Sequence, residues 1–216
     1  ILKVQLMRGE KEQDYLTHIW NLTSMMDHPI IAKEEDQDEA CYRQFYEEAI
    51  SLCRQKRFHE VLEKCRYTSL DDEEEYSIDV IQPEKIEFKQ NSYEDGENSI
   101  ISFPEFLLLV LDVCTGGEQP ASHYQPDKLI EKFDALKTYF TAGEFYEKML
   151  YYRLLLDYYT IRRDIKDGQG NYSLILKGPK DDSDKLKQYQ SMLYVSTEAF
   201  YNWLKPYLRK LQAPYA

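Results

Sequence analysis

Motifs that identify a chemical reaction are missing from this 216-residue sequence. It has neither the G-x-S-x-G turn of serine hydrolases nor the glycine-rich loop ending in Gly-Lys-Ser/Thr that holds nucleotide phosphates. Its four histidines fall in no H-x-x-x-H or H-E-x-x-H spacing, which a helical zinc or iron site would need. We therefore expect no catalytic, cofactor-binding or metal-binding residue in this chain.

Closely spaced cysteines and long apolar runs are missing as well. No apolar run reaches the roughly twenty residues that cross a membrane. No two cysteines form a C-x-x-C pair, and in a chain of this size such cysteines are typical of reduced, buried thiols rather than of a metal site or a disulfide set. We therefore expect a cytoplasmic protein with four reduced thiols. The four are Cys41, Cys53, Cys65 and Cys114.

Basic residues are fewer than acidic residues in this sequence. The chain has 27 basic and 39 acidic residues, and its formal net charge is −12. The average surface should therefore repel phosphate, which argues against a general binder of nucleic acid or anionic membranes. Local basic patches remain candidates for contacts with phosphate or with another protein surface. Roles at helix ends and in solubility fit these residues better. The candidates are Arg162, Arg163, Lys166, Lys205, Arg209 and Lys210.

Apolar residues concentrate in the stretch 100–114, which reads IISFPEFLLLVLDVC. Ser102 is a good helix cap, Pro104 suits the first turn, and Glu105 completes the spacing of a capping box. The following residues leave no polar face, so a helix here must be surrounded by protein. Gly116 and its neighbour end it. The sequence thus predicts a mainly α fold, a multi-helix bundle around a buried central helix at about 103–115.

Amphipathic segments on both sides of this stretch predict the remaining elements. We expect helices at 10–26 and 38–65, with a break near 56–57, and others beginning at Pro126 and at Thr141. The helix that begins at Thr141 should end at Arg162 and Arg163, where cations favour the negative end of the helix dipole. A short strand at 172–176, a helix from about 183 to 195 and a helix at 197–211, kinked at Pro206, complete the series.

The middle of the chain differs from the rest, because 71–75 is a run of five acids. We expect an acidic insert at 67–99, and at 76–100 either a small β-hairpin or an irregular segment. Otherwise residues 1–216 read as a single helical domain. The chain begins within an apolar pattern and without methionine, so we expect it to be a piece of a longer protein.

Five stretches resemble, in order, the helical region of the GmrSD family of modification-dependent restriction systems. The opening ILKVQLM and residues 19–27 are similar to its first segments. Residues 102–108, reading SFPEFLL, resemble its "inFpeFLLhvL" signature. Residues 152–163, reading YRLLLDYYTIRR, are similar to its "yRflfDrYiikR" helix. Residues 190–195 with Trp203 and Leu204 resemble its "QsmLhVs…WL" close.

This resemblance implies a role without chemistry of its own. In the family, nucleotide hydrolysis belongs to a ParB-like domain upstream, and the nuclease centre lies downstream. The chain would be a helical connector that positions those two domains, with DNA engaged through the parent protein and no membrane partner. Two alternatives remain open: a protein-interaction module without a nucleic-acid role, and a helical domain that contacts DNA through its Arg and Lys clusters.

Overall fold

The structure, a computed structural model, describes residues 3, 13–31, 38–65, 96–117, 119–166, 171–180, 183–196 and 199–212. It is mainly α-helical with one small antiparallel sheet, which confirms the predicted fold class. Of the segment 76–100, expected to be a small β-hairpin or irregular, residues 76–95 lie outside the described residues. The helices are α2 (Gln13–Ser24), α3 (Glu39–Arg54), α4 (Phe58–Cys65), α5 (Phe103–Thr115), α6 (Leu129–Leu136), α7 (Ala142–Tyr159), α8 (Ser183–Ser196) and α9 (Leu204–Gln212). Short 3-10 turns are η2 (Ala121–Tyr124), η3 (Pro126–Lys128), η4 (Lys137–Tyr139) and η5 (Phe200–Asn202).

Helix α5 is buried as the sequence predicts. Its start is held by Glu105, whose carboxylate accepts from the backbone N and the hydroxyl of Ser102, each at 2.8 Å. Gly116 ends it in the left-handed conformation, with φ of 66°. The six residues from Phe106 to Leu111 are all at most 2% exposed. An apolar surface on every side requires neighbours on every side, and α6, α7, η2 and η3 provide them.

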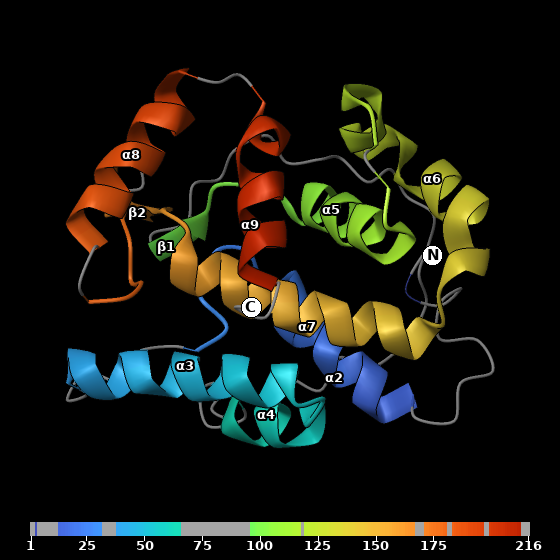
Figure 1. Cartoon of the computed structure of the whole chain (residues 1–216), viewed down its shortest axis with the longest axis horizontal. Coiled ribbons are helices and arrows are strands. Elements are labelled where there is room, and N and C mark those ends of the chain that lie inside the picture. The colour runs from blue at the N-terminus through green and yellow to red at the C-terminus, as the bar shows by residue number, and fades with distance from the viewer. Residues whose placement is uncertain are drawn as a thin grey trace.

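Helix α7 contacts more of the fold than α5 does. It packs on α2, α3, α5 and α9, and Figure 1 shows it crossing the middle of the molecule with α5 on one side and α3 on the other. Its first turn is a complete capping box, in which the Thr141 hydroxyl accepts from the Glu144 N–H at 3.2 Å and the Glu144 carboxylate accepts from the Thr141 N–H at 2.9 Å. Twelve of its residues are buried, so the core surrounds both α5 and α7.

The sheet has the order β1-β2-β3, from β1 (Gly96–Ser99), β2 (Arg162–Ile165) and β3 (Tyr172–Ile175), all antiparallel. Strand β1 pairs Gly96 with Ile165, and β3 pairs Tyr172 with the same residue. The short strand expected at 172–176 is confirmed. The end of the insert therefore pairs with a strand more than sixty residues later, a long-range contact that local sequence patterns do not reveal.

Three details of the predicted elements need correction. Helix α7 ends at Tyr159, and Arg162 and Arg163 lie in β2, so these arginines do not cap a helix. The helix expected at 197–211 is in fact a 3-10 turn followed by α9. Since α9 begins at Leu204, Pro206 lies in its first turn, where the missing N–H costs no hydrogen bond. The break predicted near 56–57 is confirmed, with Lys56 at a φ of 60° between α3 and α4.

Candidate functional site

Among the described residues, three buried charged side chains meet at Asp157, in the last turn of α7. Its Oδ1 accepts from Nε of Arg153 at 3.0 Å and from Nη1 of Arg162. All three side chains are at most 1% exposed. Arg153 lies four residues before Asp157 on the same helix face, whereas Arg162 reaches back from β2. We call these three residues the Asp157 network.

Arg153 connects α7 to the segment that follows α2. Its Nη1 donates to the backbone carbonyl of Thr23 at 2.9 Å, and its Nη2 donates to that of His28 at 2.6 Å. In the same segment, the N–H of Ile30 donates to Oδ2 of Asp157 at 2.7 Å. The end of α2 and the chain beyond it are thus fixed to α7 by charged hydrogen bonds, the strongest class in proteins.

Arg162 connects the same carboxylate to the sheet. Its Nε donates to the carbonyl of Glu97 in β1 at 2.8 Å. The neighbouring backbone adds a bond, because the N–H of Ser99 donates to the carbonyl of Met26 at 2.7 Å. Through these bonds the Asp157 network joins α7, the chain after α2 and two strands of the sheet.

The polar groups in and around this network are paired with one another or with backbone. Burial lowers the pKa of Arg153, and the Asp157 carboxylate opposes that shift. Nearby, Tyr42 and Tyr46 hydrogen-bond to the backbone of Ile31 with O–O or O–N distances of 3.0 to 3.3 Å. Burial raises the pKa of both phenols, so they remain neutral. The charged groups and hydroxyls described here hydrogen-bond to one another or to backbone. They hold the surrounding segments in place and are not exposed to solvent.

A second buried carboxylate, Asp112, lies at the end of α5. It accepts from Nζ of Lys205 in α9 at 2.9 Å and from the Tyr124 hydroxyl at 3.0 Å. His123, 1% exposed, has Nε2 3.2 Å from the Leu108 carbonyl. Burial lowers the pKa of this histidine. We call these residues the Asp112 cluster; it attaches η2 and α9 to α5.

The basic residues singled out from the sequence have different surroundings. Arg162 is 1% exposed and fully engaged in the Asp157 network. Arg163 is half-buried and donates to the Ser99 carbonyl at 2.7 Å, and Lys166 is exposed and pairs with Asp164 at 3.0 Å. Lys205 is engaged with Asp112. Arg209 is half-buried and Lys210 exposed, both in the last turn of α9, where cations favour the helix dipole.

The thiols and histidines offer no reactive centre in the described part of the chain. Cys53 and Cys65 are buried as expected, whereas Cys41 is exposed and Cys114 is half-buried, contrary to the expectation that all four are buried. Burial raises the pKa of the Cys65 and Cys114 thiols to about 12, so neither is a thiolate at neutral pH. Within the described residues, no three His, Cys, Asp or Glu side chains come together as a metal would require. The described helices also include none with the length and apolarity that a membrane crossing demands.

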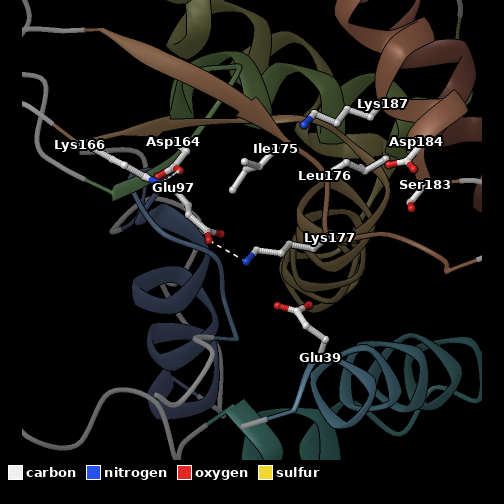
Figure 2. A pocket seen from close by; sticks show the side chains of 10 residues that line it. All are labelled: Glu39, Glu97, Asp164, Lys166, Ile175, Leu176, Lys177, Ser183, Asp184 and Lys187. Atoms are coloured by element: carbon white, nitrogen blue, oxygen red, sulfur yellow. Dashed lines mark ion pairs between the residues drawn. The ribbon is translucent and has the colours of Figure 1, made fainter. Parts of the chain in front are cut away.

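A cavity of about 510 Å³ opens beside the sheet, between the starts of α3 and α8. Figure 2 shows its lining side chains, which come from five separate parts of the sequence. They are Glu39, Glu97, Asp164, Lys166, Ile175, Leu176, Lys177, Ser183, Asp184 and Lys187. The volume is in the range of small-molecule sites, roughly 300–1,000 Å³.

Two ion pairs lie among the residues that line this cavity. Nζ of Lys177 lies 2.9 Å from Oε1 of Glu97, and Nζ of Lys166 lies 3.0 Å from Oδ2 of Asp164. The Lys177 ammonium also lies 5.6 Å from the centre of the Tyr42 ring, a favourable cation–π distance. The sequence analysis missed this site, since its acids and lysines are scattered over more than 140 residues and only the tertiary fold gathers them.

Comparisons of the chain with models of known protein families, with characterised proteins and with solved structures give no match.

Proposed function

We propose that this chain is a non-catalytic helical connector of a GmrSD-like, cytoplasmic restriction-defence protein. In that role it positions a nucleotide-hydrolysing domain on its N-terminal side and a nuclease domain on its C-terminal side. Its contribution is mechanical: it holds the two catalytic parts at a fixed separation and orientation, so that nucleotide state or DNA engagement at one part reaches the other.

The observation that carries this proposal is the place of the polar residues within the resembling stretches. Three charged residues of the stretch 152–163 match the family helix. Arg153 and Asp157 lie in the buried Asp157 network, and Arg163 is half-buried and donates to the Ser99 carbonyl. Gln190 opens the stretch 190–195 and is 2% exposed. These polar residues could have served a reaction in the family, but in this chain they hydrogen-bond helices and strands to one another.

Gln190 shows this structural use most clearly. Its amide oxygen accepts from the N–H of Ile161 at 2.9 Å, and its amide nitrogen donates to the carbonyl of Tyr159 at 2.7 Å. Gln190 thus binds both sides of the junction between α7 and β2. It attaches α8 to the residues that adjoin the Asp157 network, and a junction held on both sides resists bending. Such stiffness is what a connector needs.

Two assays test the proposal. The purified chain should neither hydrolyse nucleoside triphosphates nor cleave modified DNA with Mg²⁺ or Mn²⁺ present. In the longer protein, Asp157→Asn should lower both activities together, whereas Asp134→Asn, at an exposed ion pair, should leave both unchanged. Turnover by the purified chain, or loss of one activity alone in the Asp157 variant, would contradict the connector role.

A protein-interaction role is the second candidate, and one observation favours it. Tyr189, Met192 and Val195 recur every three residues on α8 and are 62%, 65% and 82% exposed. Apolar side chains grouped on one helix face are typical of contact surfaces. Met192→Lys should weaken binding of this chain to a separately expressed flanking domain, measured by fluorescence anisotropy, by more than Lys185→Gln on the same helix. Equal affinities for the two variants would dismiss this face.

A further inference from the structure

The cavity beside the sheet has a charge pattern that the connector role does not use. We propose that it binds a small zwitterion, a molecule that carries a cationic ammonium or guanidinium group together with an anionic carboxylate or phosphate group. This inference concerns the cavity alone and does not depend on the proposed function.

The acidic end of the cavity is formed by Glu97 and Asp164. These residues are directly paired across β1 and β2, so their side chains leave the same face of the sheet with Cβ atoms about 5 Å apart. Like charges in that position repel each other. Both side chains are largely covered, at 26% and 17% exposed, and Oε2 of Glu97 is buried without a hydrogen-bond partner among the residues that the structure describes. A ligand that donates hydrogen bonds and carries positive charge suits this end.

The opposite end is formed by α8, whose first turn also carries Asp184, and its cationic group is Lys187. Lys187 is half-buried and makes no ion pair with any described residue, and Ser183 is in the first turn of the same helix. First-turn N–H groups lack acceptors within their helix, and the helix dipole favours an anion there. In Figure 2 the side chain of Lys187 lies apart from Glu97, with Ile175 between them in this view, and the Lys177 ammonium is paired with Glu97.

The balance of charge decides which ligand fits. Four carboxylates and three ammonium groups line the cavity. An anion bound there would face the carboxylates of Glu97 and Asp164, and a simple cation would face Lys187. A molecule with both charges places each against its complement, while Ile175 and Leu176 offer an apolar wall to its carbon chain. Lys177 and Lys166 already pair with Glu97 and Asp164. A zwitterion would therefore offer its cationic group to Oε2 of Glu97, which lacks a partner among the described residues, and its anionic group to Lys187.

Titration of the whole chain with four probes tests this inference by calorimetry or by NMR shifts. L-Arginine combines guanidinium with carboxylate, and O-phosphoethanolamine combines ammonium with phosphate. The decarboxylated amine of arginine carries only positive charge, and glutarate only negative charge. We expect at least one zwitterion to bind with a Kd of about 1 mM, and each singly charged probe to bind at least about tenfold more weakly.

Matched variants locate the binding. Glu97→Gln keeps the backbone carbonyl that Arg162 uses and removes the carboxylate, and Lys187→Gln removes the opposite charge. Each should weaken zwitterion binding about tenfold, with circular dichroism confirming the fold. The controls Glu63→Gln and Lys185→Gln make the same charge changes at exposed positions outside the cavity lining and should leave Kd unchanged.

Three results would overturn the inference: no binding of either zwitterion at about 50 mM, equal binding of the decarboxylated amine, or affinities that neither cavity variant changes. None of these readouts involves nucleotide hydrolysis or DNA. Failure here would therefore leave the connector role standing, and failure of the connector role would leave the cavity untouched.

Discussion

Asp157 and Asp112 are both fully buried carboxylates, one on α7 and the other on the adjacent α5. Asp157 is held by two arginines and a backbone N–H, and these partners are themselves enclosed. Asp112 is held by a lysine, a tyrosine hydroxyl and the N–H of Gln119 at 3.2 Å. The lysine side chain keeps 11% of its surface exposed, so this second arrangement has a route to water.

The difference shows how one fold uses buried charge in two ways. The Asp157 network joins α7, the chain after α2 and the sheet through arginine side chains, each of which offers five N–H donors in a rigid fork. The Asp112 cluster joins α5 to α9 and includes His123, whose protonation can change. We therefore expect the first region to govern the stability of the whole fold and the second to govern how α9 is attached.

The largest effect should follow from Asp157→Asn. This change leaves two buried guanidinium groups without a counter-charge, and loss of one partner from a buried ion pair costs about 3–5 kcal/mol. Urea unfolding followed by circular dichroism measures it. Asp134→Asn, which removes an exposed pair with Lys137, should cost at most about 1 kcal/mol. Similar losses in the two variants would contradict the structural weight given to Asp157.

Asp112→Asn should have a smaller effect, about 1–3 kcal/mol in the same experiment. The amide can still accept the Tyr124 hydroxyl hydrogen, and Lys205 can turn its ammonium toward water. The loss should also be local, with faster amide hydrogen exchange in α9 than in α3. A loss equal to that of Asp157→Asn, spread over all helices, would erase the distinction between the two regions.

Thr141→Ala probes the start of the helix that carries Asp157. It removes the hydroxyl that accepts from the Glu144 N–H, and loss of such a cap costs about 1 kcal/mol. The matched control is Thr138→Ala, an exposed threonine in η4, which should change the free energy of unfolding by less than about 0.5 kcal/mol. Indistinguishable unfolding midpoints for the two variants would show that the cap contributes nothing.

His123→Gln should leave stability nearly unchanged at neutral pH and change its pH dependence. Burial holds the pKa of His123 below the ordinary value of 6.5, so the unfolded chain takes up this proton at higher pH than the folded protein does. The contribution of neutral His123 to the free energy of unfolding is complete above about pH 6.5, and it is lost as the pH falls below that value. Glutamine keeps a donor for the Leu108 carbonyl and cannot titrate, so unfolding of the variant should depend less on pH below about 6.5. An unchanged slope would contradict the role of His123.

The fold was predictable where local patterns are strong. The cap at Ser102, the apolar run after it and Gly116 together specified α5, because cap, burial and stop each have a local chemical cause. The end of α7 was not predictable in this way, since Arg162 suits a helix end on charge alone. Its actual place in β2 depends on pairing with Ser99, 63 residues earlier in the chain.

The candidate sites depended still more on tertiary contacts. Asp157 and Arg153 read locally as an ordinary i,i+4 pair, and only the packing of the sheet and the chain after α2 shows that the pair is enclosed. Glu97 and Asp164 come together only through strand pairing. Charge and spacing therefore identified the basic residues, but not which of them the fold would bury.

The most direct test of this account is the coupling between Asp157 and Arg162, because that contact joins α7 to the sheet. A double-mutant cycle of Asp157→Asn and Arg162→Met, measured by urea unfolding, gives this energy. We expect the two changes to be non-additive by at least about 1 kcal/mol. Additivity within about 0.5 kcal/mol would mean that the buried network does not hold the fold together.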